Sequence, residues 1–492
     1  MYFLCMSNPT PFFAAFGSLL FGQRRRSELE KLLRRDAPAP SLSQYEQAFG
    51  QYVPHSLLGR EAQGANSRQR LFPPMVIFWA FLAQVLERGS SCRDALRRIG
   101  AWWQFEDPAA ATLSPKTGGY CQARARLADP KLEQIGDHLA EELQRRQPST
   151  ELWLERTVKL IDGTSASMPD TPSNQKAWPQ PSNQKPGCGF PIVTLVGLFS
   201  LGSGALLHLL DACRHVSEVL LARQLWARLA PRDVVLADRN FCSYADLNAI
   251  AQVGADAVMR LHVRRRADFR QGRHLGPNER LLIWKKPREC PAGFTPQESA
   301  AMPPTLSVRM IRYRVQTPGF RTKNVVLITT LLDPIAYPTS ALAALYFQRW
   351  TIELHFREIK TLLGLDVLRC LSPKMVRKEI AMHRIAYNLV RILMQEAGIV
   401  HHLPLARISF KGTLDSLHHY ADAIHALSGR PRRQAAMLEQ LLQAMAEDPL
   451  PERPGRSEPR ARKRRPKNYQ LLTKPRHQMK ILQKRARHKK QS

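Results

Sequence analysis

The sequence predicts a mixed α/β protein whose central sheet is flanked by helical regions. Three observations predict this class. Residues 73–145 carry helical periodicity, five apolar strand-like segments lie between residues 157 and 263 with helical patterns among them, and helical periodicity returns after about residue 340. The 492 residues, 44% of them hydrophobic and 23% charged, are enough for several domains. These values exclude a single small module and a largely disordered chain.

Positive charge is in excess along the whole chain. Lys and Arg number 73 against 41 Asp and Glu, which gives a net charge of +32. Residues 451–492 hold 16 Lys and Arg and 2 acidic residues, or +14, so the preceding 450 residues carry +18. We therefore expect a polyanionic partner and a basic tail over 451–492 that is disordered when alone.

The cysteines and the N-terminal segment favour a cytoplasmic protein. Eight cysteines are scattered without a Cys-x-x-Cys pair, which favours reduced thiols. Residues 11–22 are apolar, but Arg24, Arg25 and Arg26 follow the run, the reverse of a signal peptide. The run is too short to span a bilayer. We expect a separate N-terminal segment over 1–40 and no membrane partner.

Residues 41–150 are expected to form a helical DNA-binding domain. Pro73 and Pro74 introduce an apolar helix over 75–87, an amphipathic pattern covers 91–103, and another helix follows Pro130. The segment 120–128 places Arg124 and Arg126 on a further helix. These two arginines could clamp DNA or belong to a solvated basic helix.

The first part of an α/β domain is expected over 151–263. Its strands form a meander of three, followed by two buried strands that alternate with helices. The strand segments are 157–166, 192–201, 205–213, 233–238 and 256–263, and the helical segments are 215–230 and 243–254.

Further regions follow from changes in pattern. Short strand candidates between turn signals predict a β-rich insertion over 264–336. The second part of the α/β domain then covers 337–400, and a C-terminal helical region covers 401–450.

Two aspartates follow apolar strand segments. The first strand is expected to end in Ile161-Asp162-Gly163-Thr164 and the fourth in Ala237-Asp238-Arg239-Asn240, so each puts a carboxylate at the end of an apolar strand. On neighbouring strands the two carboxylates would repel unless a cation lay between them, and Mg²⁺ prefers such oxygen ligands. An aspartate at a strand end can also serve simply as a helix cap.

The segment 346–360 adds a polar helix face. At 100° per residue, Tyr346, Arg349, Glu353 and Lys360 fall within roughly 60° of one another. A helix face with two positively charged side chains, a phenol and a carboxylate is not one that packs in the hydrophobic core. A solvated face with an Arg349–Glu353 ion pair is the alternative interpretation.

These motifs resemble the DDE transposases of bacterial insertion sequences, in particular the group with the Tyr-Arg-Glu-Lys signature, the insertion-sequence-four family. The likeness rests on Leu-Ile-Asp-Gly-Thr-Ser around Asp162, Leu-Ala-Asp-Arg-Asn-Phe around Asp238, and Tyr-x2-Arg-x3-Glu-x6-Lys over 346–360. It covers residues from about 157 to about 395.

The resemblance implies a ribonuclease-H-like mixed five-stranded sheet with flanking helices, interrupted by a β-rich insertion. It implies that Asp162, Asp238 and Glu353 are catalytic and hold two Mg²⁺ ions, with Mn²⁺ as a substitute. Arg349 and Lys360 would bind phosphates of the transposon end, and Tyr346 would contact the strand near the cut. In relatives an aromatic residue of the insertion holds a flipped base, which makes Trp284 a candidate. Trp284 could equally be a core residue of a small sheet.

The expected function is a transposase that binds the terminal inverted repeats of its element, pairs them as a homodimer, cuts double-stranded DNA and joins the ends to target DNA. Two alternatives remain. One is an inactive or repurposed DNA-binding repressor. The other is a ribonuclease-H-like nuclease without strand transfer, which would cut without a matched pair of ends.

Overall fold

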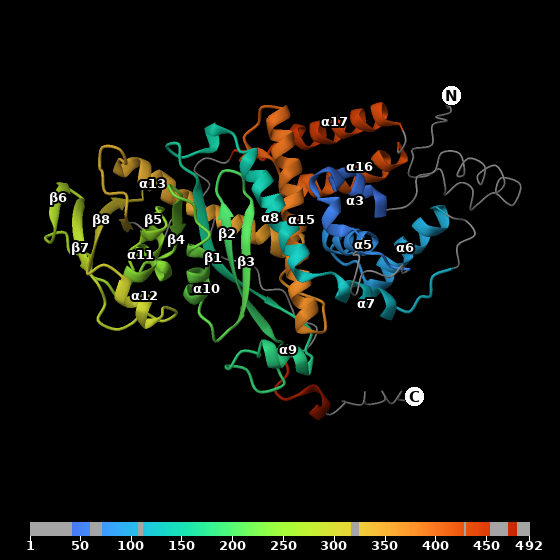
Figure 1. Ribbon diagram of the computed structural model, residues 1–492, viewed down its shortest axis with the longest axis horizontal. Helices are drawn as coiled ribbons and strands as arrows, with labels where there is room; N and C mark the ends of the chain where they lie inside the picture. Colours follow the sequence, from blue (N-terminus) through green and yellow to red (C-terminus); the bar gives the residue numbers. More distant parts are fainter. Residues whose placement is uncertain are drawn as a thin grey trace, which may run out of the picture.

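A mixed sheet with a helical body packed at one end is the main feature of the computed structural model (Figure 1). The structure describes residues 42–59, 71–106, 112–315, 324–427, 430–452 and 471–479. Within these residues the sheet has nine strands in the order β3-β2-β1-β4-β5-β9-β8-β7-β6. The strands are β1 (Val158–Ser167), β2 (Ile192–Ser200), β3 (Leu206–Cys213), β4 (Val234–Ala237), β5 (Asp256–Arg260), β6 (Arg273–Gly276), β7 (Glu279–Lys285), β8 (Thr305–Arg314) and β9 (Asn324–Thr329).

The first five strands lie close to the segments predicted from the apolar patterns. Strands β1, β2 and β3 form the expected antiparallel meander, and β4 and β5 join it in parallel on the other side of β1. All four residues of β4 are buried, as its continuous apolar run predicts for a strand with neighbours on both sides and helices over its faces. The centre of the sheet is therefore β1 beside β4.

The insertion extends this sheet, so the sheet is larger than the five strands expected. The outer edge of β5 pairs with β9 in antiparallel fashion, and β8, β7 and β6 follow in turn. An unpaired edge of β5 would leave backbone donors and acceptors without partners, and β9, whose sequence is Asn-Val-Val-Leu-Ile-Thr, supplies them. In Figure 1 these strands form the end of the molecule farthest from the helical body.

Helices from both ends of the chain build the helical body. The 28-residue helix α15 packs on α5, α8, α17 and on β3, which joins the body to the sheet. The C-terminal helical region expected over 401–450 contains two helices, α16 and α17. The helices of the body are α3 (Leu42–Phe49), α4 (His55–Leu58), α5 (Pro74–Leu86), α6 (Cys92–Glu106), α7 (Gly118–Arg126), α8 (Asp129–Arg145), α15 (Pro373–Val400), α16 (Phe410–Ala426) and α17 (Pro431–Glu447).

Shorter helices lie next to the sheet. Helix α10 packs on β1, β2 and β3, and α11 packs on β5. Part of the polar segment after β1 forms α9, whose first turn is capped by the Thr171 hydroxyl, which accepts from the Asn174 amide. These helices are α9 (Pro172–Ala177), α10 (Glu218–Trp226), α11 (Tyr244–Gln252), α12 (Pro296–Ala301), α13 (Thr339–Phe347) and α14 (Thr351–Arg357).

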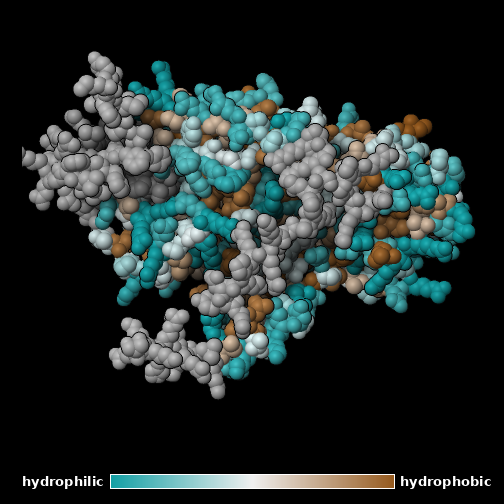
Figure 2. Space-filling model, turned by 180° about the vertical axis from the view of Figure 1, so that it is seen from behind, coloured by the Kyte–Doolittle hydropathy of each residue, from teal (hydrophilic) through white to brown (hydrophobic). Residues whose placement is uncertain are grey.

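Hydrophilic residues cover most of the described surface on the face shown in Figure 2, and hydrophobic residues are scattered among them. None of the helices in the described ranges is long and apolar enough to cross a membrane. The expected segment 1–40 and most of the basic tail lie outside the described residues. Of the tail, residues 451–452 and 471–479 are described, and Pro475 lies against Gly187 in the segment after α9.

Candidate active site

Asp162 and Asp238 occupy matching positions on neighbouring parallel strands. The pairing of β1 with β4 ends with Leu160 beside Leu236; Asp162 lies two residues further along β1, and Asp238 directly follows β4. The charge of Asp238 acts on the Asp162 carboxylate, so the two carboxylates lie near each other where β4 ends. Asp162 does not end its strand as expected but lies in the middle of β1, because β2 continues to pair with β1 as far as Ser167.

The Asp162 carboxylate is half-buried and has two partners. The backbone N–H of Gly163 donates to its Oδ1 at 2.8 Å, and Nη1 of Arg349 lies 3.5 Å from its Oδ2. Burial raises the pKa of Asp162, the two partners act to lower it, and the negative charge of Asp238 raises it further. The net direction is upward, and burial of the carboxylate is its main cause.

The segment expected to form one helix over 346–360 is helical but irregular. Helix α13 ends at Phe347, a 3₁₀ turn covers Gln348–Trp350, α14 follows, and a π-helical turn covers Glu358–Leu362. Changes of helical pitch rotate later residues relative to a regular helix, so a constant 100° per residue does not describe this segment.

Three of the four signature side chains nevertheless reach the middle of β1 and the end of β4. The Tyr346 hydroxyl donates to the Ala237 carbonyl oxygen at 3.2 Å, directly before Asp238. Nζ of Lys360 donates to Oγ1 of Thr164 at 3.0 Å, two residues after Asp162. Together with the Arg349 contact to Asp162, these contacts gather Tyr346, Arg349 and Lys360 around the part of β1 that carries Asp162 and the adjoining end of β4.

Arg349 is unusual because it is almost completely buried. Only 7% of the residue is exposed, and its guanidinium lies 4.8 Å from the centre of the Trp350 ring. Its Nε is buried and has no hydrogen-bond partner among the described residues. A buried donor without an acceptor is costly, so this N–H is available to an oxygen of a ligand.

Glu353 lies on the exposed side of α14. Within the described residues, no three His, Cys, Asp or Glu side chains lie close enough together to hold a metal ion. Glu353 therefore does not close a set with Asp162 and Asp238 in this conformation. The donor chemistry still fits a hard divalent cation, because the Asp162 carboxylate in β1 and the Asp238 carboxylate after β4 provide oxygen ligands whose mutual repulsion a cation would relieve.

A buried polar network holds the end of α14 against α15. Arg391 donates to Glu358 and, at 2.7 Å, to Nδ1 of His355, and its Nε donates to the Tyr387 hydroxyl at 2.9 Å. Burial acts to raise the pKa of Glu358, but Arg391 and His355 lower it below its usual value. This network orients the helix that carries Glu353 and the turn that carries Lys360.

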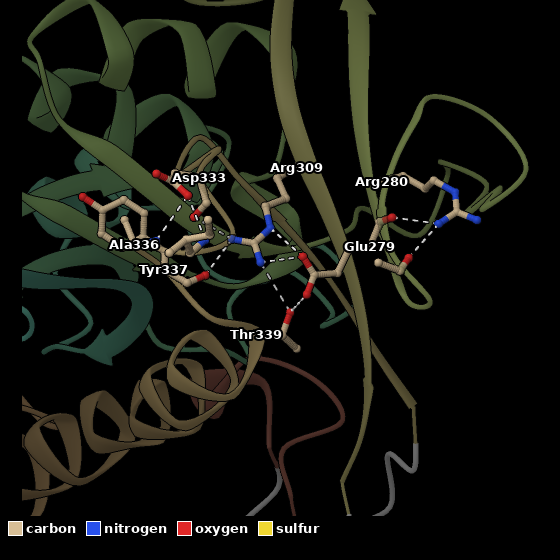
Figure 3. Close-up of polar contacts among 9 residues, drawn as sticks. Glu279, Arg280, Arg309, Asp333, Ala336, Tyr337 and Thr339 are labelled. Atoms are coloured by element: carbon tan, nitrogen blue, oxygen red, sulfur yellow. Dashed lines mark hydrogen bonds and ion pairs between the residues drawn. The ribbon is translucent and has the colours of Figure 1, made fainter.

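A second network ties the insertion to the start of α13 (Figure 3). Arg309 of β8 is completely buried and donates to Oε2 of Glu279 on β7 at 2.6 Å and to the Tyr337 carbonyl oxygen at 2.7 Å. The Thr339 hydroxyl, at the first residue of α13, donates to Oε1 of the same glutamate. Because α13 leads directly to Tyr346 and Arg349, the insertion supports the position of the site.

One acidic residue packed against β1, next to Asp162, was not recognised from the sequence. Glu218 begins α10, and the charges of Asp162 and Asp238 both act on it. In the sequence it follows Ser217, whose hydroxyl accepts from the Leu220 amide, so the pair has the appearance of an ordinary helix start. The one available signal was Gly163, a glycine within a strand, which often marks a close approach by another group.

Arg124 and Arg126 lie in the last turn of α7, away from the strand ends. Arg124 is buried, its guanidinium lies 4.6 Å from the centre of the Phe81 ring, and its Nη1 donates to Oε1 of Gln84 at 3.2 Å. This places Arg124 in the packing between α5 and α7. Arg126 is half-buried. A contact of either arginine with DNA stays a prediction.

Trp284 lies in β7, where it is paired with Leu306 of β8. The residue is buried, and the Arg265 guanidinium lies 3.9 Å from the centre of its ring. A base could stack on this ring only if Arg265 moved aside. The structure thus gives Trp284 a packing role in the insertion, and a role in holding a flipped base stays a prediction.

Comparison with known proteins gives consistent matches. The family model for a transposase DDE domain matches residues 153–389. The transposase InsG for insertion sequence element IS4 of Escherichia coli (strain K12) is 26% identical over 70% of this chain and 76% of its own. The transposase for insertion sequence element IS421 of Escherichia coli is 26% identical over 63% of this chain and 83% of its own. A solved piggyBac transposase synaptic complex with hairpin DNA matches with a TM-score of 0.41 and 12% identity, over 87% of this chain and 88% of that one.

Proposed function

Because the chain belongs to the DDE transposases of the insertion-sequence-four group, we propose that it binds the terminal inverted repeats of its own mobile element and catalyses strand cleavage and strand transfer. The observation that carries this proposal is the matched position of Asp162 and Asp238 on adjacent strands, with Arg349 beside Asp162. The order β3-β2-β1-β4-β5, with β2 antiparallel to its neighbours, supports a ribonuclease-H-like core at the centre of the sheet.

The residues that would hold divalent cations are Asp162, Asp238 and Glu353. Bound there, two Mg²⁺ or Mn²⁺ ions would supply Lewis-acid activation of the attacking oxygen and charge stabilisation of the leaving oxygen. In cleavage, a water oxygen bonds to phosphorus while the bond from phosphorus to the 3′ oxygen breaks, which leaves a 3′ hydroxyl. In strand transfer, that hydroxyl attacks a phosphodiester of the target.

Glu353 must move toward the aspartates for this chemistry. It lies on a short helix between a 3₁₀ turn and a π-helical turn, and such irregular turns often accompany functional hinges. Binding of DNA phosphates beside α14 would supply the energy for the adjustment. The buried contacts of Glu358 with Arg391 would keep the end of the helix in place meanwhile.

In this proposal the two positively charged residues of the signature, Arg349 and Lys360, bind and orient the DNA backbone. Arg349 offers a buried guanidinium with an unused Nε donor, which suits a phosphate oxygen, and Lys360 adds a point charge near Thr164. The excess of positive charge along the chain would hold double-stranded DNA at the transposon ends and at the target. Pairing of two ends would require a homodimer.

The experiment compares Asp162→Asn, Asp238→Asn and Glu353→Gln with a control, Asp170→Asn, whose exposed carboxylate lies shortly after β1. Each variant is incubated with Mg²⁺ and DNA that carries the element's ends, and both binding and cleavage are measured. We expect the three site variants to bind the ends and not cut, while the control does both. Cleavage by any of the three site variants would contradict the assignment.

A further inference from the structure

Two cysteines of the helical body lie next to each other. Cys92 is the first residue of α6 and Cys121 lies in α7, and the Cys121 thiol donates to Cys92 with the two Sγ atoms 4.0 Å apart. Sulfurs joined in a disulfide are about 2.05 Å apart, so the two are free thiols in contact. Because they come from different helices, the fold itself brings them together.

Cys92 lines a cavity of about 400 Å³ in this part of the molecule. The cavity is bounded by α5, the start of α6, Arg124 of α7, residues 363–370 and α15. Cys92 is partly exposed, so a small reagent that enters the cavity can reach its sulfur. Its place at the first residue of a long helix also favours a negative charge on that sulfur.

The groups around Cys92 act in the same direction. The hydrogen bond from Cys121 does most to lower the pKa of Cys92, burial acts to raise it, and the charge of Arg124 and a hydrogen bond with Gln84 lower it further. The negative charge of Glu379 opposes them and is the smallest of these effects. The net direction is downward, which favours the thiolate, the nucleophilic form of cysteine.

Arg124 supplies positive charge from a fixed position beside both sulfurs. The residue is more than nine-tenths buried and lines the cavity, and its charge acts on Cys92 and on Cys121. Its Nε is buried and has no hydrogen-bond partner among the described residues. A buried donor that lacks an acceptor is costly, so a negative charge nearby stabilises Arg124 as Arg124 stabilises the thiolate.

We propose that Cys92 and Cys121 are an oxidation-sensitive pair, in which a hydroperoxide oxidises Cys92 and a disulfide then joins α6 to α7. The Cys92 thiolate attacks a peroxide oxygen, the oxygen–oxygen bond breaks, and the departing oxygen takes up a proton, which leaves a sulfenic acid on Cys92. The Cys121 sulfur then attacks the Cys92 sulfur, the sulfur–oxygen bond breaks, and the hydroxyl leaves as water with the proton of Cys121. The two thiols lose two electrons, which reduce the peroxide. The sulfurs must approach by about 2 Å to form the bond. The proposal does not depend on the proposed function.

The test treats the full chain, first reduced and then freed of reductant, with hydrogen peroxide at pH 7, and maps disulfides by mass spectrometry of unreduced peptides. We expect a cross-link between Cys92 and Cys121. Iodoacetamide should modify Cys92 roughly tenfold faster than Cys290, an exposed thiol of the insertion, because an ordinary thiol is only about 3% thiolate at this pH. In Cys121→Ser the sulfenic acid of Cys92 should persist and react with dimedone. Cys290→Ser is the matched control and should form the cross-link as the unaltered chain does.

Two results would overturn the proposal. One is a cross-link of Cys92 to Cys370, which lines the same cavity but is only 6% exposed, in place of the link to Cys121. The other is modification of Cys92 no faster than that of Cys290, since Cys92 would then be an ordinary thiol. Circular dichroism establishes that each variant is folded. If Cys121→Ser does not fold, the disulfide map and the two modification rates of the unaltered chain decide the matter.

Discussion

Replacement of Arg309 by Met should strongly destabilise the insertion and its connection to α13. Arg309 is completely buried, and its main partner Glu279 is only 16% exposed at the side chain, so solvent screens their attraction little. In Arg309→Met the Glu279 carboxylate keeps the Thr339 hydroxyl as a donor but loses its countercharge. Removal of one member of a buried ion pair costs about 3–5 kcal/mol of unfolding free energy. For a unit of about 150–250 residues, this lowers the melting temperature by roughly 6 °C or more.

The assay is thermal and urea unfolding followed by tryptophan fluorescence. Arg312→Met is the matched control, because Arg312 lies on the same strand but is exposed and contacts Asn278, so its loss should change the free energy by about 0.5 kcal/mol or less. The double variant Arg309→Met with Glu279→Met removes both charges and should recover about half of the loss or more. If Arg309→Met unfolds like the control, the network does not hold the insertion to α13 and our reasoning is refuted.

Three further results are expected. Lys360→Met should weaken binding to the transposon end. It should also lower the slope of log affinity against log salt by about 0.9 for each DNA phosphate that the protein no longer neutralises. A salt titration of end binding measures both effects. Deletion of 453–492 should flatten the salt dependence of binding to unrelated DNA while recognition of the ends is kept, and loss of end recognition in a competition assay would show that the tail does more. Chelation of divalent cations by EDTA should stop cleavage but not end binding, and metal-independent cleavage would rule out the cation site at Asp162, Asp238 and Glu353.

Much of the fold could be predicted because local patterns determine it. The apolar run of β4 predicts a buried central strand, and the alternation over β1 to β3 predicts a meander. The extension of the sheet by β9 could not be predicted, since pairing between an insertion and an edge strand depends on which edges meet in space. For the same reason the insertion's strands were expected, but their place in the sheet was not.

In the candidate site, too, features that depend on local sequence could be predicted, and features that depend on contacts in three dimensions could not. Asp162 and Asp238 could be expected to meet only if their strands were neighbours in the sheet, which the sequence pattern did not determine and the pairing of β1 with β4 shows. The change from 3₁₀ to α to π geometry between Gln348 and Leu362 leaves no clear periodic signal, so the exposure of Glu353 and the burial of Arg349 were not evident. Glu218 was missed because an acidic residue at a helix start is common, and its contact with Gly163 exists only in three dimensions.

The most direct test of the account is to incubate the purified chain with Mg²⁺ and the DNA that flanks its own gene, and to map the cut ends. Glu353→Ala serves as the inactive control. The account predicts cuts at a matched pair of inverted repeats, joining of the freed 3′ ends to target DNA, and neither product with the control. Protected repeats without cuts would favour a DNA-binding repressor. Scattered cuts without a requirement for paired ends would indicate a nuclease. Either result would contradict the account.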